Sequence, residues 1–115
     1  MPCIQIKTNV KTDEAAAEKI RTVLGSSICH LPGKSEDWLL ISIQDDCRMF
    51  FGGTGGRPIA MVEILILGET IDKDGAGHMT EDITAVLGEV LGIAPSDMYI
   101  RYAASPDWGW NGSNF

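Results

Sequence analysis

Two hydrophobic periods alternate along the chain and predict a strand, a helix and a strand in its first half. Residues 3–7 alternate between apolar and polar side chains, which is typical of a strand. After Thr12, a favoured helix N-cap, residues 13 to about 30 carry apolar side chains at helical spacing. Residues 37–44 are almost continuously apolar, so we expect a second strand that is covered on both faces.

The second half of the chain repeats this order. Residues 59–67 predict a buried strand, and residues 70–77, rich in Asp and Gly, predict a loop. From Met79 onward, apolar side chains fall on one helical face until Gly92 ends the helix. Residues 98–103 predict the last long strand. The tripeptide Val-Leu-Gly occurs in both predicted helices, which supports an internal repeat.

Two strand–helix–strand units with parallel strands predict an α+β fold. The expected architecture is a four-stranded mixed sheet with two helices on one face. The opposite sheet face would be apolar and uncovered, and another subunit is the most economical way to bury it. The expected parts are a single domain over residues 1–115, a first repeat over about 2–45, a second over about 58–103, and a tail over 104–115.

Composition narrows the classes of partner. The chain has 115 residues, 44% of them hydrophobic, which suffices for one core without metals or disulfides. The formal net charge is −7, and residues 58–115 hold only two basic but nine acidic side chains. Nucleic acid and anionic membrane surfaces are therefore poor partners, because both need a basic face. The longest apolar segment, residues 59–67, is too short to insert across a bilayer.

Cysteine and histidine residues form no recognisable metal or disulfide pattern. Cys3, Cys29 and Cys47 have no Cys-x-x-Cys spacing, and His30 and His78 stand far apart in the sequence. We therefore expect no metal, and reduced thiols in a cytoplasmic protein. The N-terminal residues also lack the pattern of a secretory signal.

Conventional catalytic motifs are scarce. Residues 33–35 read Gly-Lys-Ser, but the earlier glycine of a phosphate-binding loop is missing, and residues 52–56 precede a strand instead of opening a helix. No spacing indicates a Ser-His-Asp or Cys-His site. What remains is Pro2, because removal of Met1 would expose a secondary amine. Burial or a nearby cation would lower its pKa from about 8 toward neutrality, as suits a general base.

Short motifs, each weak alone, occur along the whole chain in a specific order. They are Met1-Pro2, Thr8-Asn9, Gly33-Lys34, Phe51-Gly52-Gly53, Leu67-Gly68, Tyr99-Ile100 and the closing Trp108-Gly109-Trp110-Asn111-Gly112-Ser113-Asn114-Phe115. Together they resemble the macrophage migration inhibitory factor (MIF) branch of the tautomerase superfamily. The resemblance implies a homotrimer whose three sheets line a central barrel. It also implies keto–enol tautomerisation of arylpyruvates, of the phenylpyruvate type, and of dopachrome analogues, without a cofactor.

The resemblance also implies roles for residues of this chain. Pro2 would be the catalytic base, and Lys34 the cation that meets the carboxylate of a small anionic aromatic keto acid. The backbone at Leu67 would line the pocket, and Tyr99 would reach in from the adjacent subunit. The aromatic wall would consist of Trp108, Trp110 and Phe115.

The chain departs from the family pattern at Arg101. Vertebrate members commonly have Asn two residues after the active-site Tyr, at the place of this arginine. One interpretation is a barrel-edge residue paired with an acid. The other is a second cation in the substrate-binding pocket, which would favour anionic substrates.

Three functional hypotheses follow from the resemblance. The chain is an isomerase that uses Pro2, or a cytokine-like protein that binds a receptor and whose tautomerase activity is secondary. A structural trimer without activity is the third. The intact set of Pro2, Lys34 and Tyr99 favours catalysis. Family members can leave the cell without a signal peptide, so secretion stays open beside a cytoplasmic location.

Overall fold

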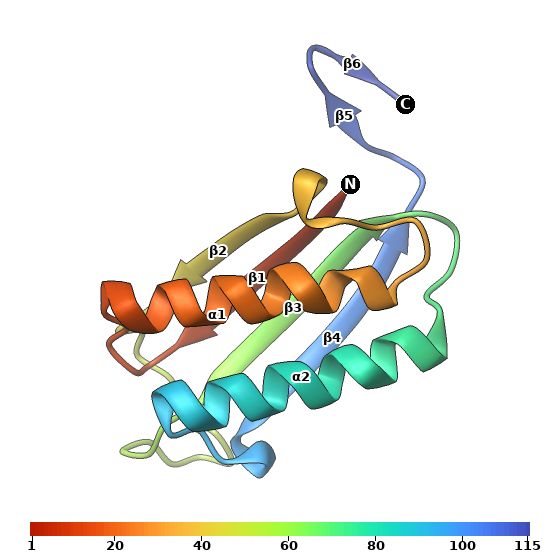
Figure 1. Cartoon of the computed structure of the whole chain (residues 1–115). Helices are drawn as coiled ribbons and strands as arrows, with labels where there is room; N and C mark the ends of the chain where they lie inside the picture. The colour runs from red at the N-terminus through yellow and green to blue at the C-terminus, as the bar shows by residue number, and fades with distance from the viewer.

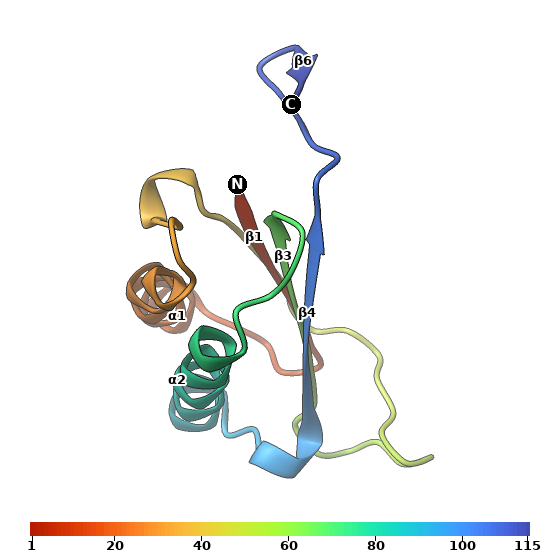
Figure 2. The same ribbon diagram turned by 90° about the vertical axis from the view of Figure 1, so that its right-hand side faces the viewer.

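Two strand–helix–strand units form a single sheet with both helices on one side of it (Figures 1 and 2). The structure is a computed structural model that describes residues 1–115. Its main elements are β1 (Pro2–Thr8), α1 (Glu14–Ser27), β2 (Leu40–Gln44), β3 (Ala60–Leu67), α2 (Lys73–Leu91) and β4 (Met98–Ser105). Short elements are the 3-10 turns η1 (Ile28–His30), η2 (Glu36–Trp38) and η3 (Pro95–Asp97), and the hairpin strands β5 (Gly109–Trp110) and β6 (Ser113–Asn114).

The sheet has the order β2-β1-β3-β4 and mixes parallel with antiparallel pairs. β1 runs parallel to β2, and β3 runs parallel to β4, whereas β1 and β3 are antiparallel neighbours at the centre. A helix joins each parallel pair, as a crossover between parallel strands requires. This confirms the predicted α+β fold with two repeats. Pro2 pairs with Ile66, so the chain begins where β3 ends.

The core lies between the sheet and the two helices. Every second residue of β1 and β3 points toward the helices and is buried. Fully buried side chains include Ile4, Ile6, Val62 and Ile64 from the sheet and Ile20, Leu24, Met79, Ile83 and Leu87 from the helices. Each large apolar side chain contributes roughly 1.5–3 kcal/mol when it is fully buried. The strand ends that carry the candidate site therefore stand on a firmly packed support.

The first helix begins one residue later than its sequence predicts. Asp13, not Thr12, is the N-cap, and its Oδ1 accepts a hydrogen bond from the Ala16 amide at 2.8 Å. The amide of Thr12 instead donates to Asp45 Oδ2 at 2.7 Å. A contact from a distant loop thus decides between two residues that both cap helices well. The α-helix itself stops at Ser27, where η1 continues the chain.

The prediction of a loop over residues 70–77 is correct only for residues 70–72, because α2 already begins at Lys73. Asp72 caps this helix by accepting a hydrogen bond from the Gly75 amide at 2.8 Å. Gly75 was interpreted as a loop residue, but it lies in α2, where the absence of a side chain allows α2 to pack closely against η1. A Cβ atom at Gly75 would lie only 2.3 Å from the carbonyl oxygen of His30.

The second strand is shorter and more exposed than predicted. Its expected first residues form η2, and β2 occupies only Leu40–Gln44. β2 is an edge strand in which Leu40, Ser42 and Gln44 are exposed, so it is not covered on both faces within one chain. The unpaired backbone groups and apolar side chains of such an edge strand can be covered by a second protein chain.

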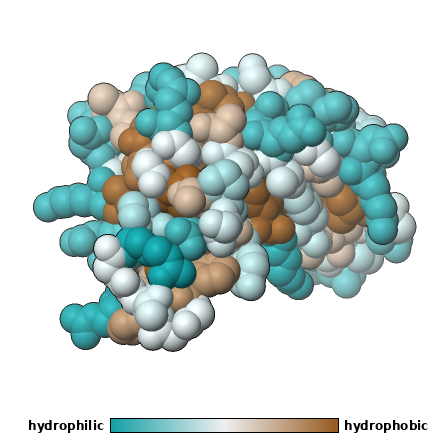
Figure 3. Space-filling view, turned by 90° about the horizontal axis from the view of Figure 1, so that it is seen from below, coloured by the Kyte–Doolittle hydropathy of each residue, from teal (hydrophilic) through white to brown (hydrophobic).

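The sheet face without helices is not apolar throughout, which corrects a second expectation. Ser42, Gln5, Glu63 and Arg101 stand in register across all four strands. Their neighbours along each strand, such as Ile4, point to the buried face. A polar row therefore crosses the middle of this face. The lower end of the molecule, away from the N-terminus, shows apolar patches among hydrophilic ones (Figure 3).

Candidate active site

Three of the predicted site residues meet at the end of the sheet where the chain begins. Pro2 is buried at the start of β1, beside Ile66 near the end of β3. Lys34 reaches this place from the loop after η1, where Gly33 adopts a φ of +76° and turns the chain. The Lys34 ammonium donates a hydrogen bond to the carbonyl oxygen of Leu67 at 2.8 Å.

The N-terminal amine lies in an environment that disfavours its charged form. Burial lowers the pKa of the Met1 amine below its usual value, and the positive charge of Lys34 lowers it further. The Leu67 amide donates a hydrogen bond to the carbonyl oxygen of Met1 at 3.1 Å. The backbone of Leu67 thus makes two hydrogen bonds here: its carbonyl oxygen accepts from Lys34, and its amide donates to Met1.

Two adjoining hollows open around the N-terminus. One, of about 640 Å³, is lined by Pro2 and Cys3 together with aromatic side chains. The other, of about 340 Å³, is lined by Lys34 and Leu67. Both hollows share the lining residues Met1, Trp38 and Trp110. Burial raises the pKa of the Cys3 thiol, which keeps it protonated beside Pro2.

All three residues predicted to form an aromatic wall line the hollows, together with Trp38, which the sequence did not reveal. Trp110 packs edge-on against Trp38 with ring centroids 5.2 Å apart, and Phe115 lies 6.4 Å from Trp110. The indole of Trp108 donates to the Ser105 carbonyl oxygen at 3.0 Å. The hairpin of β5 and β6 brings these tail residues to the same end as the N-terminus (Figure 1). Trp38 went unrecognised because its apolar neighbours made it part of a strand.

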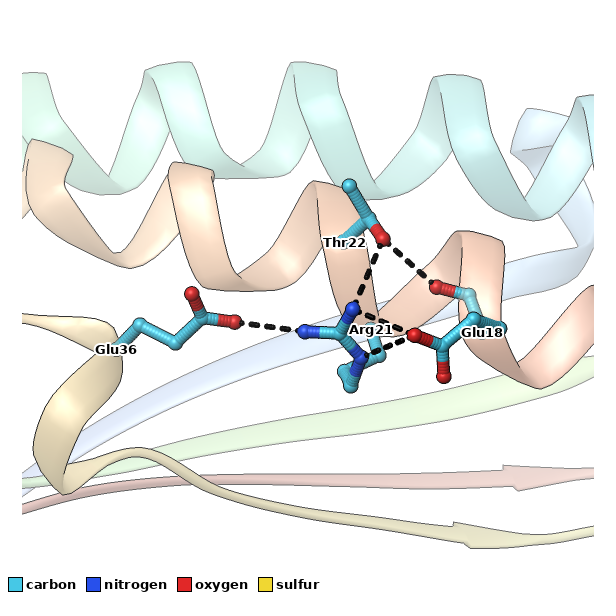
Figure 4. A network of polar contacts seen from close by, with 4 residues as sticks. All are labelled: Glu18, Arg21, Thr22 and Glu36. Carbon is cyan, nitrogen blue, oxygen red and sulfur yellow. Dashed lines mark hydrogen bonds and ion pairs between the residues drawn. The ribbon is translucent and has the colours of Figure 1, made fainter.

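An exposed polar network ties η2, which carries Trp38, to α1 (Figure 4). Arg21 donates through Nη1 to Glu36 Oε2 at 3.1 Å and through Nη2 to Glu18 Oε1 at 2.6 Å. The hydrogen bond and charge of Arg21 lower the pKa of the Glu18 carboxyl. These contacts connect α1 to η2, whose Trp38 lines both hollows.

Tyr99 and Arg101 lie away from Pro2 within one chain. Tyr99 is the second residue of β4, at the opposite end of the sheet, where its ring packs on Phe51 with centroids 5.0 Å apart. Its exposed fraction is 65%. Arg101 Nη1 donates to Glu63 Oε2 at 3.1 Å. Within a single chain, Pro2, Lys34 and Leu67 lie together at one end of the sheet, whereas Tyr99 and Arg101 do not reach them.

The arrangement can perform proton transfer on an anionic substrate. It offers an amine with a depressed pKa, a cation beside it and a largely apolar lining. The chain contains no group of three or more His, Cys, Asp or Glu side chains that could hold a metal ion. None of its helices is both long enough and apolar enough to cross a membrane.

Comparison with known proteins identifies the class. The fold is that of MIF-like proteins, and the family model described as "Macrophage migration inhibitory factor (MIF)" matches residues 1–115. The chain belongs to the MIF family, part of the tautomerase superfamily. This confirms the resemblance stated from the sequence. A search of curated proteins found no match.

Solved structures agree with the family assignment. A Leishmania major structure, MIF2, is 28% identical over 100% of this chain and 97% of its own, with a TM-score of 0.90. A MIF homologue from Prochlorococcus marinus is 26% identical over 98% of each chain, with a TM-score of 0.80. The MIF of Trichinella spiralis, at 22% identity over 98% of this chain and 99% of its own, shares the fold with a TM-score of 0.79.

Proposed function

We propose that residues 1–115 form a single tautomerase domain that interconverts the keto and enol forms of arylpyruvates, of the phenylpyruvate type, and of dopachrome analogues. The general base is the N-terminal amine of Pro2 after removal of Met1, and no cofactor takes part. One observation carries the proposal: the N-terminal amine lies beside Lys34 in an apolar hollow, and its pKa is depressed.

Removal of Met1 would place the secondary amine of Pro2 in this environment. Burial and the positive charge of Lys34 lower the pKa of the Met1 amine, and we expect both to act in the same direction on the amine of Pro2. A lowered pKa leaves a larger share of the amine neutral near pH 7, and only the neutral form can accept a proton. An amine whose pKa lies near the working pH is an efficient general base.

The same processing step would free a hydrogen-bond donor. The Leu67 amide donates to the carbonyl oxygen of Met1, so removal of Met1 leaves this N–H without its acceptor next to Pro2. The oxygen of a forming enol gains negative charge, and a fixed backbone N–H stabilises such charge well. Lys34, with its ammonium held at the Leu67 carbonyl, is placed to bind the substrate carboxylate.

The reaction itself moves one proton and changes no oxidation state. The amine of Pro2 takes the proton from the carbon next to the ketone, and the electron pair of that C–H bond forms the enol double bond. The π electrons of the carbonyl move to its oxygen, which takes the proton back from the protonated amine, directly or through a water molecule. The oxygen becomes the enol hydroxyl, and the amine is neutral again. In the reverse direction the protonated amine returns a proton to carbon, so the base and the acid are the same group.

We propose a homotrimer in which each site is completed by a neighbouring subunit, with the three sheets around a central barrel. The exposed edge strand β2 and the exposed Tyr99 at the far end of the sheet support this arrangement. Tyr99 of one subunit would then face Pro2 of the next, beside Trp108, Trp110 and Phe115. Family membership supports the same assembly.

The test replaces Pro2 by glycine in the full chain and follows enolisation of phenylpyruvate. General-base catalysis contributes about 100-fold or more. Glycine leaves a flexible primary amine in place of the fixed secondary amine of Pro2, so P2G should lose a large part of that contribution to kcat/KM. The matched control is P95G, which makes the same change at an exposed proline of η3. Mass spectrometry of the wild-type protein should show that its first residue is Pro2. Unchanged turnover by P2G, or full turnover by protein that keeps Met1, contradicts the proposal.

A further inference from the structure

We propose that Arg101 binds a second anionic group of the substrate, at the end remote from the carboxylate held by Lys34. The preferred substrate class is then a dianionic keto acid, such as an arylpyruvate with an acidic group on its ring. The inference rests on the proposed function and on a site shared between subunits.

The placement of Arg101 follows from its distance to Tyr99. The two residues are two positions apart on β4, so their side chains point from the same sheet face about 7 Å from one another. Both side chains are exposed, Tyr99 to 65% and Arg101 to 61%. A neighbouring site that receives the Tyr99 ring therefore also lies within reach of the long Arg101 side chain.

The contact that Arg101 makes within its own chain is easily replaced. Nη1 donates to Glu63 Oε2 at 3.1 Å, and this is the hydrogen bond that holds the side chain. Exposed ion pairs of this kind contribute little to stability. A guanidinium has five N–H donors in a planar fork that fits a carboxylate with two parallel hydrogen bonds. A substrate carboxylate can thus displace Glu63 or share the guanidinium with it.

Arg101 is one of the few cations in the second half of the chain. Residues 58–115 carry only Lys73 and Arg101 as cations against nine acids. Within one chain, Lys34 is the cation that lines the hollows at Pro2. A site with Lys34 alone would neutralise one carboxylate, whereas a second cation from the neighbour would favour a second negative charge on the substrate.

The experiment compares two substrates that differ by one charge, phenylpyruvate and 4-carboxyphenylpyruvate. The readout is the ratio of kcat/KM for the carboxylated substrate over the plain one. We expect the wild-type protein to favour the carboxylated substrate. Because hydrogen bonds to charged groups are strong, R101Q should lower the ratio about tenfold or more, and R101K should retain part of it.

Two further variants separate the local effect from general electrostatics. E63Q removes the acid that competes for the guanidinium, so the ratio should rise. K19Q removes one positive charge from an exposed ion pair with Glu89 on the helix side, and the ratio should stay as in wild type. Native mass spectrometry checks that each variant keeps the wild-type assembly.

The outcomes distinguish this inference from the proposed function. If both substrates are turned over but R101Q leaves the ratio unchanged, Arg101 only pairs with Glu63 along the sheet, and the inference is overturned. A ratio that falls equally in K19Q also overturns it. If wild-type protein turns over neither substrate, or P2G turns over both normally, the proposed function fails instead.

Discussion

At the scale of single residues, Lys34 acts on the N-terminus in two ways. Its ammonium is fixed by the Leu67 carbonyl oxygen at 2.8 Å, which orients the charge. That charge also lowers the pKa of the N-terminal amine, second to the effect of burial. Under the proposed function, one cation would therefore both bind the substrate and favour the neutral form of the base.

This double role predicts a shift in the pH profile. Only the neutral amine is active, so kcat/KM for phenylpyruvate should rise with pH and reach half its maximum below about 8, the usual value for an α-amine. K34Q removes the repulsion between Lys34 and the protonated amine, so its midpoint should move upward. Burial still acts, and the midpoint should therefore remain below the usual value. The profile is measured by enolisation rates from pH 5 to 9.

A control cation keeps this prediction specific. Lys11 is exposed in the loop between β1 and α1, at the other end of the sheet from Pro2. K11Q should leave the midpoint where it is in wild type. If K34Q also leaves it there, the charge of Lys34 does not tune the base, and burial alone explains the depressed pKa.

Part of the site could be predicted from the sequence and part could not. Pro2, Lys34 and Leu67 were recognised through a resemblance, because nothing in their spacing shows that a loop, a strand start and a strand end will meet. Trp38 was missed because its apolar character is equally typical of a strand. Side chains that gather from separate loops leave no periodic signal.

At the scale of elements, the sequence predicts which helices and strands exist better than where they begin. Apolar periodicity placed both helices and all four main strands in the correct order. The early start of α2 was hidden because glycine is typical of loops, whereas Gly75 here allows close contact with His30. Such a contact depends on the packed fold and is invisible in a local pattern.

The two glycines in the first turns of α2 should respond oppositely to alanine. At Gly75 a Cβ would lie 2.3 Å from the His30 carbonyl oxygen, so G75A should lower the free energy of unfolding by about 1–3 kcal/mol. At Gly77 a Cβ would meet no atom of another part of the chain within 4 Å. G77A should therefore raise the free energy of unfolding by about 0.5–1 kcal/mol through helix propensity. Urea denaturation measures both values. Equal effects of the two variants contradict this account of the helix start.

At the scale of the whole molecule, the candidate site residues of one chain lie at opposite ends of its sheet. Pro2, Lys34 and the aromatic tail lie at one end, and Tyr99 packs on Phe51 at the other. The sequence could not place these halves relative to one another, since periodicity describes a single chain. A cyclic assembly, in which each subunit meets the next by the same contact, would unite the two halves at every interface.

Subunit mixing tests this arrangement directly. P2G lacks the secondary amine of proline and Y99A lacks the neighbour's contribution, so each homotrimer should be strongly impaired. In randomly mixed trimers, about a quarter of the sites combine an intact Pro2 with an intact Tyr99 from the next subunit, and this share of wild-type turnover should return. Co-expressed, differently tagged chains give the mixture, and native mass spectrometry confirms its composition. Unmixed variants in one solution should stay impaired. Mixed trimers without recovered turnover would show that Tyr99 does not complete the site of the adjacent subunit.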